Sequence, residues 1–356
     1  MIGLKPEIAE NKQSDKKAIK CVVWDLDNTL WNGVLLEDDR VCLQDNAIAI
    51  IKTLDSRGIL QSIASKNDYA KAMAKLQDFG LSEYFIYPQI NWNSKAHSIQ
   101  EIAKSINIST DAIAFIDDQL FELEEVRFSL PEILCINVTD LEQLLDLPEM
   151  NPRFITEDSK NRRLMYLSDI NRKKAEEKFV GSQEEFLATL NMHFTISFAK
   201  EEDLQRAEEL TVRTHQLNTT GYTYSYDELD RFRQSENHKL LIASLEDKYG
   251  SYGKIGLTLV ECQENLWTIK LLLMSCRVMS RGVGTVMLNY ITKLAKENNV
   301  RLCAEFVSNN RNRMMYIAYK FAGFKESDKK GELVILENDL NQIQPFPEYM
   351  KVQIID

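Results

Sequence analysis

The stretch VVWDLDNTL, residues 22–30, decides the fold of the first part of the chain. Apolar residues lead into an Asp-x-Asp-x-Thr pattern, which predicts a buried strand that ends in two carboxylates. Side chains alternate between the two faces of a strand, so we expect Asp25 and Asp27 on the same face. Such a pair can hold Mg²⁺ beside an aspartate that acts as a nucleophile.

Polar residues also follow two other predicted strands and precede a helix. Ser65 follows the apolar run 59–64, and Asp117 and Asp118 follow the run 112–116. Lys95 lies on a loop before a helix. A hydroxyl can donate to a phosphoryl oxygen, a fixed cation can neutralise charge, and carboxylates complete an oxygen shell for Mg²⁺.

For any one of these residues alone, an ordinary loop residue that caps a helix is the better explanation. Together they occur in chain order, each where a strand or loop meets a helix. Ligands bind at the carboxyl ends of the strands in a doubly wound parallel sheet. The pattern therefore favours a phosphoryl-transfer site with a bound metal ion.

The composition indicates globular domains without a general affinity for nucleic acid. A chain of 356 residues, 44% of them hydrophobic, suggests two domains with full cores. The net charge of −11 argues against general affinity for nucleic acid. The six cysteines are scattered without CxxC pairs, which indicates a reducing compartment and neither a disulfide framework nor a zinc site. No apolar run has the length of a membrane span or forms a leader peptide, so we expect a cytoplasmic protein.

The pattern of elements divides the chain into four segments. We expect a polar lead-in over 1–19, an α/β domain over 20–147, a helical linker over 148–181 and an α+β domain over 182–356. Strands and helices alternate in the first domain, which predicts a parallel sheet. The gaps between its motifs are too short for a cap domain. We therefore expect an open site that suits a large substrate or a second domain acting as a lid.

The second domain carries a glycine-rich turn between a strand and a helix. The stretch CRVMSRGVG, residues 276–284, precedes the periodic helix 285–297. Backbone N–H groups and the helix dipole make such a turn an anion site. The expected anion-binding residues are Arg281, Gly282, Val283 and Gly284.

Cys276 is a second candidate reactive centre. The turn and the neighbouring Arg277 can lower the pKa of its thiol and favour the thiolate. A thiolate can be acylated by an acyl phosphate and then pass the acyl group to a carrier thiol. The alternative is a small buried hydrophobic side chain, as for most free cysteines. His215, Asn218 and Thr219 lie in a polar turn that either lines this second site or caps a helix.

The two parts together resemble the FkbH family, in which a capless haloacid dehalogenase (HAD) phosphatase domain is joined to a GNAT-like acyltransferase domain. The resemblance covers roughly residues 20–340. The stretches that carry it are VVWDLDNTLWNGVL, GILQSIASKND, FGLSEYFIYPQINWNSK, AFIDDQ, RTHQLNTTGYTYS and MSCRVMSRGVGTVML. GNAT proteins bind the pyrophosphate of coenzyme A with this glycine-rich loop. Met279 stands where that loop usually has Arg or Gln, which disfavours ordinary use of acetyl-CoA.

The resemblance implies an enzyme that takes 1,3-bisphosphoglycerate, removes phosphate and delivers the glyceryl group to the phosphopantetheine thiol of an acyl carrier protein. It assigns Asp25 as nucleophile and Asp27 as general acid and base. Ser65 and Lys95 would bind the phosphoryl oxygens. The Mg²⁺ site would consist of Asp118, Asp25 and the Asp27 carbonyl, with help from Asp117. One alternative is a plain Mg²⁺-dependent phosphatase whose second domain binds a partner or covers the open site. The other is an N-acetyltransferase fused to a phosphatase.

Overall fold

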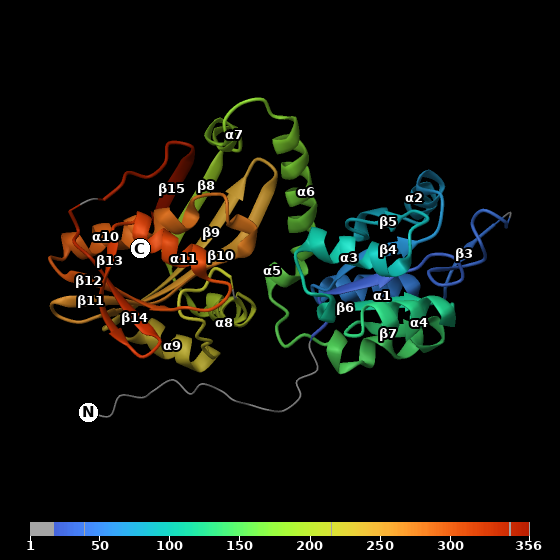
Figure 1. The fold of residues 1–356 in the computed structure, drawn as a ribbon, viewed down its shortest axis with the longest axis horizontal. Helices are drawn as coiled ribbons and strands as arrows, with labels where there is room; N and C mark the ends of the chain where they lie inside the picture. The colour runs from blue at the N-terminus through green and yellow to red at the C-terminus, as the bar shows by residue number, and fades with distance from the viewer. Residues whose placement is uncertain (1–17, 39, 215, 342, 356) are drawn as a thin grey trace. The chain divides into compact units, whose positions relative to one another are not determined.

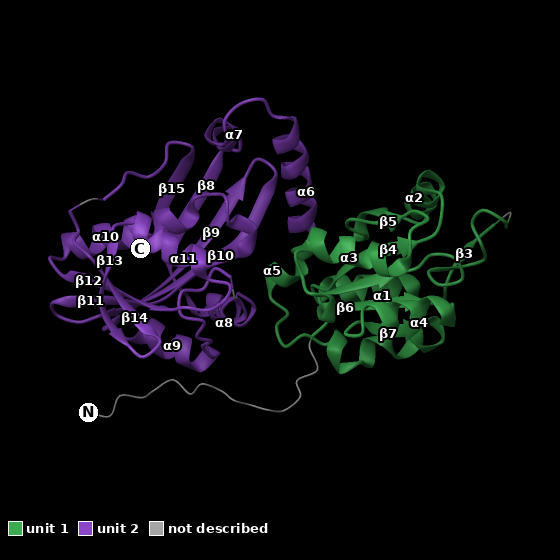
Figure 2. Cartoon of the chain, viewed as in Figure 1, with its two compact units in different colours: residues 1–163 green, residues 164–356 purple. Residues whose placement is uncertain are grey.

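The computed structural model describes residues 18–38, 40–214, 216–341 and 343–355 (Figure 1). The chain divides into two compact units, unit 1 (Met1–Arg163) and unit 2 (Leu164–Asp356), shown in Figure 2. The boundary falls within helix α6 (Arg162–Lys178), inside the segment expected as a linker. Most of the expected lead-in and the candidate residue His215 lie outside the described residues.

Unit 1 contains a five-stranded sheet in the order β5-β4-β1-β6-β7, and every neighbouring pair is parallel. The strands are β1 (Cys21–Trp24), β4 (Leu60–Ser65), β5 (Gln89–Ile90), β6 (Ile113–Asp117) and β7 (Leu134–Asn137). The apolar strand β1 is fully buried at the centre, where Trp24 lies opposite Ile63 on one side and Ile116 on the other. This register brings Asp25, Ser65 and Asp117 to the same edge of the sheet.

Helices follow the strands of unit 1 in alternation (Figure 1). They are α1 (Ala47–Ser56), α2 (Tyr69–Asp78), α3 (Lys95–Ile106), α4 (Leu120–Ser129) and α5 (Glu157–Lys160). The side chain of Ser94 accepts from the backbone of His97 and so starts α3, which makes Lys95 its first residue. Between β1 and α1 the described residues add only the short antiparallel strands β2 (Trp31–Asn32) and β3 (Cys42–Leu43).

Unit 2 is built on an eight-stranded sheet in the order β13-β14-β12-β11-β10-β9-β8-β15. Its strands are β8 (Met192–Phe198), β9 (His238–Asp247), β10 (Gly250–Cys262), β11 (Leu266–Met274), β12 (Arg301–Val307), β13 (Phe324–Lys330), β14 (Leu333–Asn338) and β15 (Met350–Ile355). Most neighbours are antiparallel, while β11 with β12 and β15 with β8 are parallel. An α/β unit with a parallel sheet followed by an α+β unit confirms the predicted fold class.

Both faces of the second sheet are covered by apolar packing. Its helices are α7 (Gln183–Thr189), α8 (Leu204–Arg213), α9 (Tyr226–Gln234), α10 (Val283–Glu297) and α11 (Arg313–Phe321). Leu241 of β9 belongs to the apolar cluster that includes Val286 of α10, whereas the next residue, Ile242, belongs to the cluster that includes Leu204 of α8. Because successive strand residues face opposite sides, α10 and α8 cover opposite faces.

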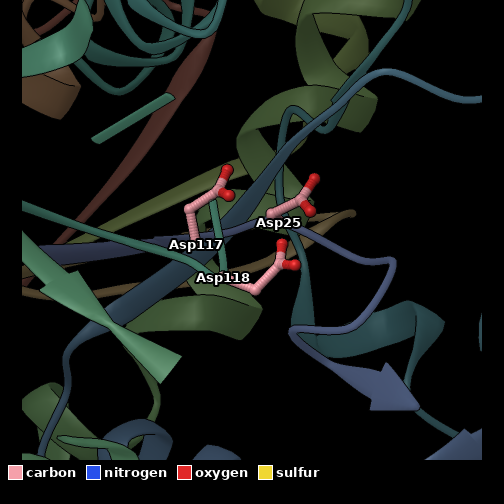
Figure 3. Close-up of side chains that lie close together, drawn as sticks. All are labelled: Asp25, Asp117 and Asp118. Carbon is pink, nitrogen blue, oxygen red and sulfur yellow. The ribbon is translucent and has the colours of Figure 1, made fainter. Parts of the chain in front are cut away.

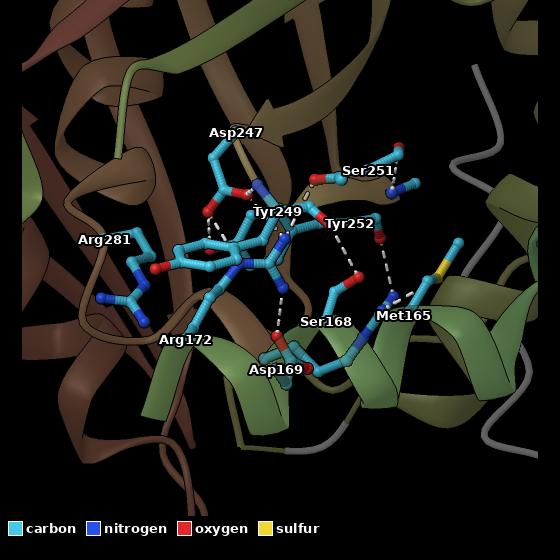
Figure 4. A network of polar contacts seen from close by, with 12 residues as sticks. Met165, Ser168, Asp169, Arg172, Asp247, Tyr249, Ser251, Tyr252 and Arg281 are labelled. Carbon is cyan, nitrogen blue, oxygen red and sulfur yellow. Dashed lines mark hydrogen bonds and ion pairs between the residues drawn. The ribbon is translucent and has the colours of Figure 1, made fainter. Parts of the chain in front are cut away.

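Helix α6 is held to the β9–β10 hairpin by a buried polar network (Figure 4). The guanidinium of Arg172 donates two hydrogen bonds to Asp247, at 2.7 and 2.9 Å, and one to Asp169 at 2.6 Å. It also lies 3.7 Å from the ring centre of Tyr252, whose hydroxyl donates to Asp247.

Within the described part of the chain, no helix combines the length and apolarity needed to cross a membrane.

Candidate active site

Three carboxylates of unit 1 converge at the carboxyl ends of two neighbouring strands (Figure 3). Asp25 follows β1, Asp117 ends β6, and Asp118 comes next in the chain. One ligand atom of each lies within 4.8 Å of the others. Carboxylate oxygens are the ligands that Mg²⁺ prefers, so the residues present fit this ion. The structure therefore brings together three of the predicted metal ligands.

Lys95 is the buried cation of this cluster. Its ammonium donates to Asp25, to Asp117 at 3.0 Å and to the carbonyl of Ala64 at 2.9 Å. Burial alone would lower the pKa of Lys95, but the charges of Asp25 and Asp117 raise it above the usual value. Lys95 consequently stays charged and lies where it can neutralise a group bound to Asp25.

The carboxylates repel one another in the absence of a divalent cation. The pKa of Asp117 is raised to about 6, first by burial and then by the charge of Asp25, although Lys95 opposes the shift. Burial, followed by the charge of Asp25, also raises the pKa of Asp118. A bound divalent cation would remove this repulsion, because it stabilises the ionised form of each ligand.

Asp27 lies outside the carboxylate cluster and is held by its own hydrogen bonds. Its Oδ1 accepts from the indole N–H of Trp31 at 2.8 Å and from the backbone of Leu35 at 3.0 Å, while its Oδ2 accepts from Asn67 at 2.9 Å. Burial raises the pKa of Asp27, although the bonds from Leu35 and Trp31 oppose the shift. A carboxyl that is oriented on both oxygens and has a raised pKa suits a general acid. Its carboxylate lies outside the three-residue cluster, and the use of its carbonyl as a metal ligand stays a prediction.

Two further side chains help to shape the site. Ser65, the last residue of β4, is buried beside β1. The hydroxyl of Thr29 accepts from the backbone of Asp118 at 3.0 Å and lies 3.4 Å from its carboxylate. Sequence analysis did not identify Asn67 as a partner of Asp27. The available signal was its position two residues after the serine at the end of β4.

Cys276 in unit 2 is exposed, so the alternative of a buried hydrophobic side chain is wrong. It begins a short 3₁₀ turn, η6 (Cys276–Val278), after β11. The guanidinium of the neighbouring Arg277 donates to the carbonyl of Tyr252 at 2.8 Å and contacts the sulfur of Met165. The thiol is therefore accessible, while Arg277 is engaged with other groups.

The glycine-rich turn starts helix α10. Gly282 has φ of +77°, and a Cβ there would lie 2.5 Å from the hydroxyl of Tyr349. A Cβ at Gly284 would meet no atom within 4 Å, so the first turn of the helix is open on that side. The side chain of Val283, the first residue of α10, is buried.

Arg281, predicted to bind an anion in this turn, has a buried side chain. It is 6% exposed, and its guanidinium lies 3.7 Å from Glu176 of α6. Among the described residues, no acceptor lies within hydrogen-bonding distance of its Nε and Nη1. The structure thus places Arg281 next to the turn but packs its side chain within unit 2.

The segment 217–219 fills the fork between β11 and β12. These strands pair only as far as Ile269 and Ala304. Beyond that point, Thr219 bonds the main chain of Leu272 on one side and of Val307 on the other, both at 3.0 Å. Asn218 and Thr219 are completely buried. Both residues hold the sheet together, which favours their structural interpretation.

No protein-family model matches the sequence, and no curated protein matches it. Among solved structures, the chain is similar to the N-terminal part of a Bacteroides fragilis protein that contains a phosphatase domain complexed with Mg, with 28% identity over 42% of this chain and 39% of that chain and a TM-score of 0.28. It is similar to a HAD-superfamily hydrolase from Ehrlichia chaffeensis, with 16% identity over 36% of this chain and 97% of that chain and a TM-score of 0.30. It is also similar to the ribosomal-protein-S18-alanine N-acetyltransferase from Escherichia coli, with 17% identity over 41% of this chain and 92% of that chain and a TM-score of 0.33. The chain thus spans 39% of the length of the first of these proteins.

Proposed function

We propose that unit 1 catalyses Mg²⁺-dependent phosphoryl transfer through a phosphorylated Asp25. The observation that carries this proposal is the cluster of Asp25, Asp117 and Asp118 around the ammonium of Lys95. Phosphoryl transfer depends mainly on positioning and on neutralising charge. The site provides positioning and charge neutralisation through oxygen ligands for a metal ion, a buried cation and a carboxyl that is held separately.

In the proposed reaction, a carboxylate oxygen of Asp25 attacks phosphorus and the bond to the leaving group breaks. Asp27 gives its proton to the leaving oxygen. Water then attacks the phosphorus of the aspartyl-phosphate, Asp27 accepts a proton, and phosphate leaves. Lys95 and the hydroxyl of Ser65 hold the phosphoryl oxygens. Bound Mg²⁺ supplies further neutralisation of the phosphoryl charge.

For unit 2 we propose acyl transfer to the phosphopantetheine thiol of an acyl carrier protein. The Cys276 thiolate attacks the carbonyl of an acyl phosphate, phosphate leaves, and the resulting thioester passes to the carrier thiol. The exposure of Cys276 and the open side of Gly284 support this proposal. A 1,3-bisphosphoglycerate-like substrate fits both units, since it offers an acyl phosphate to Cys276 and a phosphate ester to Asp25. The scattered free cysteines support a cytoplasmic location.

The alternative function is a plain phosphatase in which unit 2 only binds a partner or acetyl-CoA. The filled fork between β11 and β12 favours the form in which unit 2 binds a partner, because segment 217–219 bonds both strand ends and leaves no room between them for the arm of acetyl-CoA or of a carrier protein. A search for an acyl adduct on Cys276 distinguishes the two functions.

The test of the unit 1 proposal is phosphate release from acetyl phosphate and 3-phosphoglycerate with Mg²⁺ or with a chelator. We expect turnover only with Mg²⁺, and a higher Mg²⁺ requirement in Asp118→Asn. The exposed Asp140 provides the control Asp140→Asn, which should behave as wild type. Full turnover in the chelator would remove the proposal.

A further inference from the structure

Large apolar side chains are exposed at the edge of the first sheet that carries the proposed phosphoryl-transfer site. They lie on the segments that follow β1, β4, β5 and β6 at their carboxyl ends, and we call them the apolar rim: Leu36, Tyr69, Trp92, Leu120 and Phe121. Trp92 is 70% exposed and Phe121 is 73% exposed, although side chains of this size are usually buried for the most part.

Two members of the apolar rim adjoin residues that hold Asp27. Leu36 follows Leu35, whose backbone N–H donates to the carboxylate of Asp27 at 3.0 Å. Tyr69 comes two residues after Asn67, whose side chain donates to the other oxygen of Asp27 at 2.9 Å. Both apolar side chains are therefore anchored next to the proposed general acid.

The remaining members adjoin the phosphoryl-binding and metal-binding residues. Trp92 follows Asn91, whose backbone N–H donates to the carbonyl of Ser65 at 3.0 Å. Leu120 comes two residues after Asp118, one of the three clustered carboxylates. Because successive Cα atoms lie 3.8 Å apart, the backbone of each of these apolar residues is within about 8 Å of the site.

The apolar rim indicates a partner larger than a small ester. Exposed apolar side chains that gather in one place mark interaction surfaces, and aromatic residues are enriched at protein interfaces. Within the described part of unit 1, these side chains stay exposed, and only the short strands β2 and β3 stand where a cap could have been inserted after β1. A leaving group of the size of glycerate cannot contact side chains spread over four segments.

The segments that carry the apolar rim are acidic. Over residues 34–40, 66–71, 91–94 and 119–125, Asp and Glu outnumber Lys and Arg. Glu37 and Asp38 are exposed beside Leu36, and Asp68 is exposed beside Tyr69. An apolar surface with acidic side chains is complementary to a protein segment that carries apolar and basic residues, and it repels an anionic lipid surface.

We infer that the apolar rim binds a protein segment that presents a phosphorylated side chain flanked by apolar and basic residues. Asp25 attacks the phosphorus, the bond from phosphorus to the side-chain oxygen breaks, and Asp27 gives its proton to that oxygen. Water then releases phosphate from Asp25. This inference rests on the proposed phosphoryl transfer in unit 1 and adds a class of substrate that is larger than the small esters.

The test compares three synthetic phosphoserine peptides with free O-phosphoserine. The leucine–lysine peptide has leucines beside the phosphoserine and lysines at its ends. The second peptide has glutamates in place of the lysines, and the third has glycines in place of the leucines. The quantity measured is kcat/KM for phosphate release by the full-length protein with Mg²⁺. We expect the leucine–lysine peptide to exceed each of the other three substrates by about tenfold or more.

Loss of a rim side chain should reduce this preference. Trp92→Ala and Phe121→Ala should each lower the ratio of kcat/KM for the leucine–lysine peptide to that for O-phosphoserine by about fivefold, the effect of losing one aromatic anchor. Phe128 is 89% exposed on the same helix as Phe121, but it lies seven residues and about 10 Å further along. The matched control Phe128→Ala should therefore keep the wild-type ratio. Because the ratio does not depend on the amount of folded protein, partial misfolding cannot imitate the effect.

Equal kcat/KM for the leucine–lysine peptide and O-phosphoserine would overturn the inference, as would an unchanged ratio in both rim variants or an equal fall in Phe128→Ala. Equal turnover of the lysine and glutamate peptides would overturn the selection for basic residues. Preferred turnover of phosphatidate in phosphatidylcholine vesicles would assign the apolar rim to a lipid surface instead. In each case, Mg²⁺-dependent phosphate release from acetyl phosphate leaves the proposed function standing. If acetyl phosphate shows no turnover that depends on Mg²⁺ and Asp25, the proposed function itself fails, and the inference with it.

Discussion

The ammonium of Lys95 donates a 3.0 Å hydrogen bond to the carboxylate of Asp117. Because the same ammonium also bonds Asp25, one buried cation ties the end of β1 to the end of β6. Without it, three carboxylates would face one another with no positive charge among them. The arrangement holds the proposed nucleophile in place and presents a cation to the group that it attacks.

Lys95→Ala should lower turnover of phosphate esters by a factor on the order of 10² to 10³, as expected for the loss of a preorganised charge at the reacting centre. Mg²⁺ affinity should be retained, since Lys95 is not a metal ligand. Steady-state kinetics and Mg²⁺ titration by calorimetry measure the two effects. Lys104, exposed on the same helix, provides the control Lys104→Ala. Parallel losses of metal affinity and turnover would show that Lys95 is structural.

Asp27→Asn should affect substrates according to their leaving groups. An alkyl ester such as 3-phosphoglycerate needs a proton on the departing oxygen, so its turnover should fall by about 10²-fold or more. Acetyl phosphate has a much better leaving group, so the first step, measured as phosphoryl-enzyme formation in a rapid quench, should change far less. An equal loss of that first step on both substrates would contradict the assignment of Asp27 as general acid.

Cys276 should carry an acyl group after incubation of the protein with 1,3-bisphosphoglycerate. Intact-protein and peptide mass spectrometry should find the adduct on wild type and on Cys42→Ala, which removes another exposed cysteine. Cys276→Ala should lack the adduct and retain phosphate release from esters in unit 1. A holo carrier protein should discharge the adduct. An adduct that persists in Cys276→Ala would remove the acyl-relay role, and unit 2 would then be a binding domain.

Arg172→Met should destabilise unit 2 by about 3–5 kcal/mol, because it leaves the buried carboxylate of Asp247 without its partner. Lys174, exposed on the same helix, provides the control Lys174→Met, for which we expect a change within about 0.5 kcal/mol. Hydrogen exchange of the β9 and β10 amides at increasing denaturant measures the difference. Equal stabilities for the two variants would contradict the importance of the network.

The sequence was sufficient to predict the parallel sheet and the cluster at its edge. Asp25 and Asp117 each follow an apolar run, and parallel strands end at a common edge, so their proximity follows from local patterns. By contrast, Lys66 donates a hydrogen bond to Glu122, 56 positions further along the chain, and no local sequence pattern predicts that these two side chains meet.

Local sequence patterns also did not predict where the side chain of Arg281 points. Its place before Gly282 suggested a role in binding an anion, but packing with Glu176, far away in the sequence, determines where its side chain lies. Similarly, the fork that segment 217–219 fills depends on where two strands diverge. Such features arise from tertiary packing, which periodicity and motif spacing do not specify.

The most direct measurement is to identify the residue that carries the phosphoryl group. The protein is incubated with Mg²⁺ and acetyl phosphate, quenched in acid, and digested for mass spectrometry of the peptide that contains Asp25 and Asp27. We expect the phosphoryl group on Asp25, and none when Mg²⁺ is chelated or in Asp25→Asn, which should also lose turnover by orders of magnitude while remaining folded. A phosphoryl group on a different residue, or near-normal turnover in Asp25→Asn, would contradict phosphoryl transfer through Asp25.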